Sequence, residues 1–238
     1  MLYLIGLGLN HKGISRQGLE IAQKCKKVYL ESYTIKFPYD FDKLEEVLKK
    51  KFTIADREKV ENLSIIDEAR KKDVALLVYG SPLFATTHVT LVDEAMKSGV
   101  RVKAIHSASV FDAIAMTGLQ LYKFGKITSL PKWNEKKKFM PDSFVDIIKD
   151  NKKIDAHTLL LVDISLRFED ALNQLEVSFK NKKFKSGKIL VCEKLGTKKQ
   201  NIIYDTIKGL KKEEIKEPYC FIIPGKLHFS EEEFLKSE

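Results

Sequence analysis

A loop of small and polar residues carries the strongest chemical signal in this chain. The sequence Gly80-Ser81-Pro82-Leu83-Phe84-Ala85-Thr86-Thr87-His88 follows the apolar run Val74 to Tyr79 and precedes a helical pattern. Its glycine and proline suit a tight turn, and Thr86 or Thr87 can cap the helix. Taken alone, this pattern is typical of an ordinary strand-to-helix turn. In open α/β sheets, however, ligands bind where strand gives way to helix, so we predict a binding loop here.

Two other strand ends in the first half suit the same role. Gly6-Leu7-Gly8-Leu9 follows the first predicted strand, and Ala108-Ser109-Val110 follows a strand that ends at Ile105. A dinucleotide-binding fingerprint needs a glycine three residues after Gly8, and His11 stands there, which disfavours a nicotinamide cofactor. The glycines still let a ligand or another backbone segment approach closely. We expect these loops to meet at one edge of a sheet.

Strand ends of the second half carry comparable residues. They are Val162-Asp163, Leu195-Gly196 and Pro224-Gly225-Lys226-Leu227-His228. We expect all of these loops to converge on one ligand, which predicts a site between two domains.

The elements that must position these loops alternate between strand and helix in the first half. The predicted elements are strand Leu2–Ile5, a helix from Ser15, strand Val28–Glu31, a helix from Asp42, strand Val74–Tyr79, a helix from Thr87 and strand Val102–Ile105. Such alternation predicts right-handed crossovers and a mostly parallel sheet. Along the helix that begins at Thr87, we expect Val89, Val92, Ala95 and Met96 to form the buried face before Gly99 ends it.

A change in composition near Leu119 to Gly125 predicts a domain boundary. The predicted domains are residues 1–118 and residues 119–238, and the fold class is α/β with a ligand cleft between two α/β domains. The second domain is expected to contain strand Ile127–Leu130, helix Ser143–Lys149, strand Thr158–Asp163, a helix with Phe168, Ala171, Leu172, Leu175 and Phe179 on one face, strands Ile189–Glu193 and Tyr219–Ile223, and a short terminal helix.

Composition narrows the classes of protein. With 238 residues, 44% of them hydrophobic and 32% charged, the chain can form two domains of ordinary size. No apolar run approaches the roughly 20 residues that a membrane span needs, and the chain enters a strand directly, so we expect a cytoplasmic protein without a membrane partner. The net charge of +9 favours an acidic partner. Because the lysine runs lack interleaved aromatic residues, we expect no direct contact with nucleic acid.

Cysteine and histidine patterns point away from metal and disulfide chemistry. Cys25, Cys192 and Cys220 are far apart in apolar patterns, which predicts buried, unpaired thiols. The five histidines show no metal-ligand spacing, so we expect no metal.

Ordered short motifs along nearly the whole chain give a family resemblance. They are Tyr3-Leu4-Ile5-Gly6-Leu7-Gly8-Leu9, Gly18-Leu19-Glu20-Ile21-Ala22, Glu31-Ser32-Tyr33-Thr34, Ala85-Thr86-Thr87-His88, Thr117-Gly118-Leu119, Tyr122-Lys123-Phe124-Gly125-Lys126, Asp142-Ser143, His157-Thr158-Leu159-Leu160, Asp163-Ile164 and Pro224-Gly225-Lys226-Leu227-His228. On these motifs the chain resembles the diphthine synthases, above all their archaeal forms, which are S-adenosylmethionine-dependent methyltransferases of the tetrapyrrole methylase superfamily.

The resemblance implies a cofactor, a substrate and an assembly. The cofactor would be S-adenosylmethionine, bound in a cleft between the two domains, and the protein would be a homodimer. The substrate would be translation elongation factor 2, on which a histidine carries a 3-amino-3-carboxypropyl group whose amine is methylated repeatedly to give diphthine. By position, the implied cofactor-binding residues are Leu9, Ser81, Phe84, Ser109, Val110, Val162, Leu195 and His228.

One departure from the family and one open assignment follow from the resemblance. The family has Gly-Asp-Pro-Leu where this chain has Gly80-Ser81-Pro82-Leu83, so a hydroxyl replaces a carboxylate. An amine must be neutral to attack a methyl group, and His88, Lys226 and Asp163 are the candidate proton acceptors nearest the expected cleft. Each has an ordinary structural interpretation of equal weight, so no catalytic acid or base is assigned.

Two other functions compete with this interpretation. A methyltransferase of the same superfamily could act on a tetrapyrrole precursor or on RNA. A tetrapyrrole carries many carboxylates and would favour arginines in the pocket, and none of the five arginines lies in a predicted cleft loop. A basic RNA-binding protein without catalytic activity is the alternative of another class.

Overall fold

The computed structural model describes residues 1–237 and divides the chain into two compact units. The first unit contains Met1–Ala113 and the second Ile114–Glu238. This division falls shortly before the boundary that we expected between Gly118 and Leu119. Each unit contains one five-stranded sheet. No helix among the described residues is long and apolar enough to cross a membrane.

The first unit is built on a parallel sheet, as the strand and helix alternation predicted. Its strands are β1 (Leu2–Gly6), β2 (Lys27–Glu31), β3 (Thr53–Ala55), β4 (Val74–Val78) and β5 (Val102–Ile105). They pair in the order β3-β2-β4-β1-β5, with every pair parallel. The carboxyl ends of β4, β1 and β5 therefore lie side by side at one edge.

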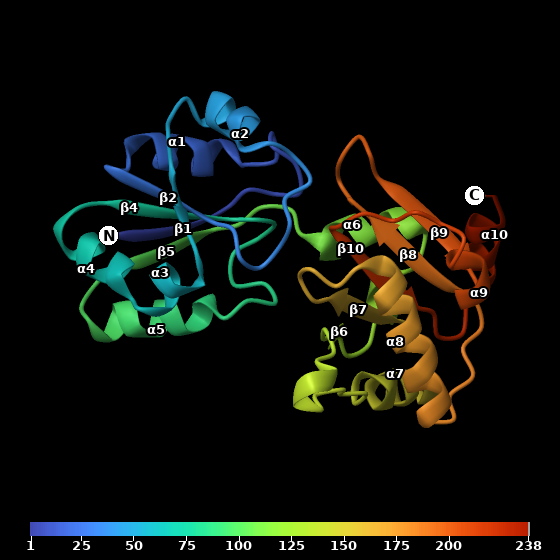
Figure 1. The fold of residues 1–238 in the computed structure, drawn as a ribbon. Coiled ribbons are helices and arrows are strands. Elements are labelled where there is room, and N and C mark those ends of the chain that lie inside the picture. Colours follow the sequence, from blue (N-terminus) through green and yellow to red (C-terminus); the bar gives the residue numbers. More distant parts are fainter. Residues whose placement is uncertain (238) are drawn as a thin grey trace. The chain divides into compact units, whose positions relative to one another are not determined.

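Helices cover both faces of this sheet. Figure 1 shows α1 and α2 on one face and α3, α4 and α5 on the other. Their bounds, with that of the short α6, are α1 Arg16–Lys24, α2 Phe41–Leu48, α3 Arg57–Glu61, α4 Ser64–Lys71, α5 His88–Lys97 and α6 Val110–Ala113. Alternate residues of the strands enter two separate cores, so that Leu4 and Leu76 face α3–α5 while Ile5 and Leu77 face α1 and α2. Burial on both faces explains why β4 is an unbroken apolar run.

The predicted buried face of the α5 helix is half right, because Ala95 is buried and Val92 packs against the same core. Val89 and Met96 are 59% and 67% exposed, whereas Leu91 and Ala95 are buried together with His88. Both choices satisfy helical spacing, because residues three or four apart share a face wherever the count starts. Thr87 precedes the helix as expected, but its side chain makes no capping hydrogen bond. Ser15 does cap α1, since its hydroxyl accepts a hydrogen bond from the Gly18 N–H at 3.1 Å.

The second unit is built on a mixed sheet. Its strands are β6 (Thr128–Leu130), β7 (Thr158–Val162), β8 (Ile189–Glu193), β9 (Asn201–Asp205) and β10 (Tyr219–Ile223). They pair in the order β6-β7-β10-β8-β9, and β10 runs antiparallel to both of its neighbours. Only β6 and β7 are parallel. The sequence analysis did not anticipate β9 or, in the first unit, β3, α3 and α4.

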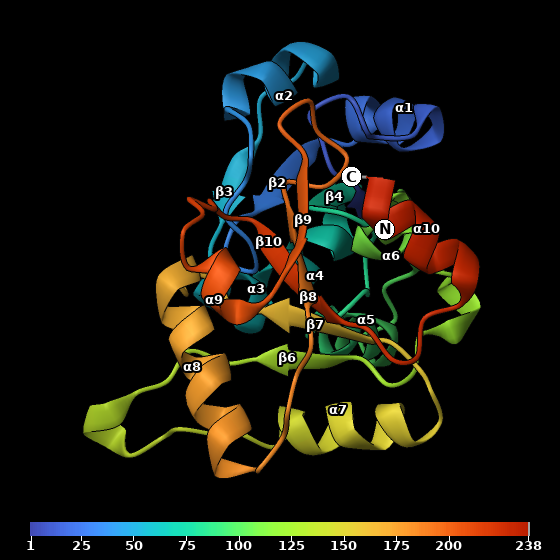
Figure 2. The same ribbon diagram turned by 90° about the vertical axis from the view of Figure 1, so that its right-hand side faces the viewer.

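One face of the second sheet packs against two long helices. The helical segments of this unit are η1 Ile114–Thr117, η2 Leu121–Lys123, η3 Glu135–Lys137, α7 Phe144–Lys153, α8 Phe168–Asn181, α9 Ile207–Leu210 and α10 Phe229–Ser237. Figure 2 shows α7 running alongside β6. The predicted stripe of α8 is confirmed, because Phe168, Ala171, Leu172, Leu175 and Phe179 all enter one core. The three cysteines are free and buried, as predicted.

Candidate functional site

Three loops meet at the carboxyl edge of the first sheet. The loops after β1 and β4 are joined by two backbone hydrogen bonds, from Gly8 N–H to Gly80 C=O and from Gly80 N–H to Gly8 C=O, both 3.0 Å. Both glycines have positive φ, at 67° and 72°, which an L side chain adopts only with strain. The loop after β5 joins them, since the Ser107 hydroxyl donates to the Gly13 carbonyl at 2.8 Å. The predicted meeting of these loops is confirmed.

Close packing at this edge requires a glycine at Gly6. A Cβ added at Gly6 would lie 2.7 Å from the Gly80 carbonyl oxygen and 2.9 Å from Pro82. A Cβ added at Gly80, in contrast, would meet only Ala108 and Ser109, at 3.9 Å. The loop after β5 therefore lies at ordinary van der Waals distance from the Cβ position of Gly80, without the close contacts found at Gly6.

The loop after β4 is held in a strained conformation. Leu83 and Ala85 adopt left-handed φ values of 67° and 51° on either side of Phe84. The Phe84 ring packs edge-on against Phe111, with centroids 4.4 Å apart. Strained non-glycine residues cost of order 1 kcal/mol each and persist where the surrounding structure holds them, often in ligand-binding segments. The aromatic pair joins the loop after β4 to α6 through apolar contact.

Several groups expected to bind the cofactor already have partners in this unit. The Ser81 hydroxyl lies 3.2 Å from His106 Nδ1, and the Leu9 carbonyl accepts from the Tyr79 hydroxyl at 3.0 Å. The Ser109 N–H donates to the Asp112 carboxylate at 2.6 Å. Cofactor binding at these positions must therefore use their other backbone groups and the shape of the loops.

The second unit does not bring its three predicted loops together. Since β7 and β8 run in the same direction, Val162 and Leu195 follow strands that end at one edge of the sheet. The antiparallel β10 ends at the opposite edge, and His228 follows it. Within this sheet the loop after β10 is therefore apart from the other two, and the contact of all three loops with one ligand stays a prediction. His228 is exposed, and its Nδ1 lies 2.8 Å from the Ser230 hydroxyl.

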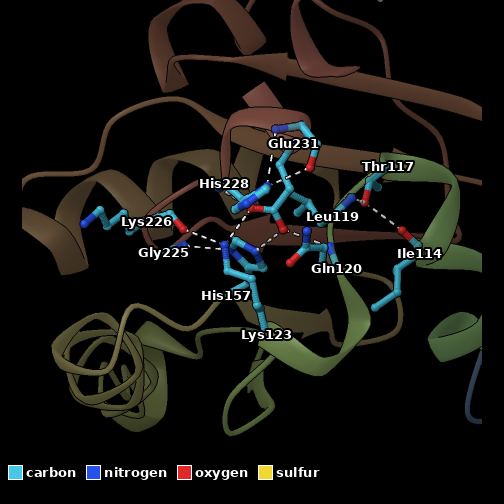
Figure 3. Close-up of polar contacts among 11 residues, drawn as sticks. Ile114, Thr117, Leu119, Gln120, Lys123, His157, Gly225, Lys226, His228 and Glu231 are labelled. Carbon is cyan, nitrogen blue, oxygen red and sulfur yellow. Dashed lines mark hydrogen bonds and ion pairs between the residues drawn. The ribbon is translucent and has the colours of Figure 1, made fainter. Parts of the chain in front are cut away.

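A buried carboxylate organises the motifs near His228 (Figure 3). Glu231, on α10, is fully buried and accepts hydrogen bonds from the Gln120 N–H at 2.9 Å and the His228 N–H at 2.7 Å. It also pairs with the Lys123 ammonium at 2.6 Å. The bond from His228 is half of a capping box, in which a glutamate three residues into a helix accepts from the N-cap. This cluster fixes the start of α10.

His157 completes the cluster as a neutral side chain. The Gly225 N–H donates to His157 Nδ1 at 2.9 Å, so the proton resides on Nε2, which donates to Glu231 at 3.1 Å. Burial lowers the pKa of His157 and outweighs the raising effect of Glu231. Burial alone would raise the pKa of Glu231, but the hydrogen bonds of His228, Lys123, Gln120 and His157 lower it to about 2. Every polar atom of this cluster is paired, which is the mark of a structural network.

The three candidate proton acceptors differ in their surroundings. Lys226 and Asp163 are exposed, and Asp163 accepts a hydrogen bond from the Lys132 N–H at 3.2 Å. His88 is only 1% exposed, at the start of α5 in the first unit. Its neighbours are Glu31 and Tyr33, from a motif that the sequence analysis listed without assigning it a role. Among residues 1–237, no group of three or more His, Cys, Asp or Glu is placed to hold a metal ion.

The family of this chain follows from comparison with known proteins. The family model described as "Tetrapyrrole (Corrin/Porphyrin) Methylases" matches residues 1–211. The chain belongs to this family of methyltransferases. Its paired α/β units and the glycine-lined loop edge are what that membership predicts.

The relatives within the family are more specific. A curated protein of Methanococcus maripaludis named "Diphthine synthase" is 41% identical over 253 residues, which cover 99% of this chain and 98% of the relative. An Arabidopsis thaliana protein named "Probable diphthine methyl ester synthase" is 39% identical over 271 residues, covering 99% and 97%. A solved structure titled "Crystal structure of diphthine synthase" superposes with a TM-score of 0.89 at 33% identity, covering 99% of this chain and 94% of that one.

Proposed function

We propose that this chain acts as a diphthine synthase. It would transfer methyl groups from S-adenosylmethionine to the amine of the 3-amino-3-carboxypropyl group on a histidine of elongation factor 2. The observation that carries the proposal is sequence identity of 41% to a protein named "Diphthine synthase", over 99% of this chain and 98% of that relative. The confirmed meeting of the β1, β4 and β5 loops supports it, because a methyltransferase needs a preformed cofactor site.

The first unit offers residues that fit the cofactor. When bound, S-adenosylmethionine supplies an activated methyl group on a sulfonium. We propose that it lies beside Gly80 and contacts the unit through Leu9, Ser81, Phe84, Ser109 and Val110. The absence of close contacts at the Gly80 Cβ position and the apolar Phe84–Phe111 pair on these loops support this site for a ligand with a flat, apolar portion. These loops would hold the cofactor still and so align donor and acceptor.

We propose that three residues of the second unit also contact the cofactor, and the observations that support them differ. Val162 and Leu195 share a sheet edge, and we propose that both contact the cofactor. His228 is included through the resemblance alone, because it lies at the opposite edge. We expect His228→Ala to separate its two roles by calorimetry. A tenfold fall in cofactor affinity would assign it to the cofactor, and unchanged affinity with a lower melting temperature would assign it to the α10 cap.

Ser81 replaces the aspartate of the family, and we propose that its contact is made by the backbone. Its hydroxyl already lies 3.2 Å from His106 Nδ1, which leaves the main chain to face the ligand. We therefore expect Ser81→Ala to keep the affinity for S-adenosylmethionine within about twofold in calorimetry. A loss of tenfold or more, equal to about 1.4 kcal/mol, would show that the hydroxyl binds the cofactor.

The test of the proposed reaction is a count of methyl groups. Cofactor affinity is measured by calorimetry, and elongation factor 2 carrying the 3-amino-3-carboxypropyl histidine is then incubated with enzyme and cofactor. Mass spectrometry should show successive additions that end at three methyl groups on the amine. Cofactor binding without any addition would leave the methyltransferase class intact and reject this acceptor.

A second candidate product is favoured by the Arabidopsis relative, whose name specifies a methyl ester. A methyl ester would require transfer to the carboxylate of the same group as well. The two products differ by one methyl group and by sensitivity to alkaline hydrolysis, which removes only an ester methyl. We propose the amine-only product, as in the archaeal enzymes that the chain resembles.

The proposal extends to assembly and location. We propose a homodimer that works in the cytoplasm, where the translation factor resides, without a membrane or nucleic-acid partner. Light scattering at several protein concentrations gives the assembly state. A tetrapyrrole acceptor or an RNA acceptor remains the competing substrate class, and neither would be consistent with methyl additions confined to the modified histidine.

A further inference from the structure

The first unit contains a buried polar cluster beside the proposed cofactor loops. It consists of Glu31 at the end of β2, Tyr33 just after it and His88, the first residue of α5, with Thr86 two residues before His88 in the chain. Since β2 pairs with β4, this cluster lies one strand away from the loop that carries Ser81 and Phe84. The proposed cofactor contacts of this unit do not include any of its members.

Glu31 presents a buried negative charge that no cation neutralises. Its side chain is fully buried and accepts from the N–H groups of Tyr33 at 2.8 Å and Thr34 at 2.7 Å, and from the Thr34 hydroxyl at 2.7 Å. Within residues 1–237, no lysine, arginine or histidine forms an ion pair with this carboxylate. A buried charge held only by neutral donors attracts a positively charged ligand.

His88 and Thr86 leave polar atoms without partners in this cluster. Within the described part of the chain, His88 Nδ1 and Thr86 Oγ1 are buried and make no hydrogen bond. His88 Nε2 lies 3.5 Å from the Tyr33 hydroxyl, and the two rings meet edge to face. Burial lowers the pKa of His88 and outweighs the raising effect of Glu31, so the imidazole is neutral at neutral pH. The tautomer with its proton on Nε2, in which Nε2–H donates to the Tyr33 oxygen, leaves the Nδ1 lone pair able to accept a proton.

We propose that Glu31, Tyr33, Thr86 and His88 form the subsite for the acceptor amine, with His88 Nδ1 as the proton acceptor. This rests on the proposed function. The acceptor reaches the site as an ammonium and leaves as a trimethylammonium, and both carry the positive charge that Glu31 attracts. The Tyr33 ring already has the Arg57 guanidinium 5.4 Å from its centroid, so this ring attracts cations.

The proton balance of the step is simple. One N–H bond of the acceptor ammonium breaks and its proton forms a bond to His88 Nδ1, which leaves a neutral amine and an imidazolium. The imidazolium returns its proton to water before the next methyl transfer, so that no other reactant is consumed. Because Nδ1 is buried, the amine reaches it through a local opening.

The test compares His88→Gln with Val89→Gln, one position along the same helix where the side chain is 59% exposed. For each variant, melting temperature, cofactor affinity and single-turnover methylation of modified elongation factor 2 are measured. We expect His88→Gln to slow methylation by about 100-fold or more while cofactor affinity changes by less than about twofold. Val89→Gln should match the wild type. Glu31→Gln should weaken binding of the modified elongation factor more than binding of the cofactor.

The pH profile separates a proton acceptor from a structural residue. Glu31 and Tyr33 face His88 from the segment after β2, and Arg57 and Glu61 of α3 act on Tyr33. If His88 takes the proton, raising the pH frees the amine in solution and should partly restore the His88→Gln rate. A wild-type rate in His88→Gln would overturn the inference, as would equal losses of stability, cofactor affinity and rate with no recovery at high pH. Absence of methylation by the wild-type chain would instead reject the proposed function.

Discussion

Glu31 in the first unit and Glu231 in the second are both fully buried, yet they are satisfied to different degrees. Glu231 is paired with a lysine, a histidine and two backbone N–H groups, and the histidine uses both of its ring nitrogens. Glu31 has neutral donors only, and the nearby His88 keeps an unpaired nitrogen. Buried polar groups in folded proteins are normally paired, so an incomplete cluster points to a missing ligand. The cluster around Glu231, whose carboxylate is paired with donors from four residues, therefore stabilises the fold.

The largest effect expected from this comparison is a loss of folding stability when Glu231 is replaced. Glu231→Ala leaves the Lys123 ammonium, the His157 N–H and two backbone donors without their acceptor. Removing one partner of a buried ion pair costs about 3–5 kcal/mol. Denaturant unfolding should show a loss of this size, whereas Glu232→Ala, exposed on the same helix, should change stability by no more than about 0.5 kcal/mol. A loss below about 1 kcal/mol in Glu231→Ala would mean that the cluster is not structural.

Acid should destabilise the protein through the same carboxylate. The pKa of Glu231 is lowered from 4.5 to about 2 in the folded state, so its stabilising contribution is full above pH 4.5 and is lost as the pH falls toward 2. A shift of this size corresponds to about 3 kcal/mol. Urea unfolding between pH 6 and pH 2.5 should show this acid limb in the wild type and a shallower one in Glu231→Gln. Equal slopes in the two proteins would contradict the assignment.

The two clusters also differ in how far the sequence could predict them. The motifs containing Lys123, His157 and Gly225 were visible in the sequence, but their common partner was not, because Glu231 lies 108 residues beyond Lys123. A local pattern carries no information about which distant helix returns to a given strand edge. The shared edge of the loops after β1, β4 and β5, in contrast, followed from strand and helix alternation, because parallel strands place their carboxyl ends together.

The predictions that differ from the structure share one physical origin, because local patterns do not specify which distant segments pack together. Helical spacing alone could not decide which face of α5 is buried, so His88 was considered without its surroundings. The direction of β10 was not encoded in any local signal, so the sequence did not show that this strand ends at the edge opposite to Val162 and Leu195. The cluster of Glu31, Tyr33 and His88 depends on pairing between β2 and β4, across 42 residues of intervening chain (32–73) that include two unpredicted helices.

The smallest expected effect tests whether the unpaired polar atoms around Thr86 and His88 serve to bind a ligand. Thr86→Val replaces a buried, unpaired hydroxyl with a methyl group of nearly the same volume. Because an unsatisfied buried hydroxyl costs free energy, we expect the variant to be more stable than the wild type by about 1 kcal/mol in thermal unfolding. The same variant should methylate modified elongation factor 2 more slowly, since stability gained at a binding site is commonly offset by lost function.

Two other results for Thr86→Val would contradict this prediction. Lower stability would indicate that a water molecule completes the cluster. Higher stability with an unchanged rate would show that the hydroxyl has no part in binding the acceptor. Only the combination of greater stability and a slower reaction matches the contrast with Glu231, where every substitution should weaken the fold.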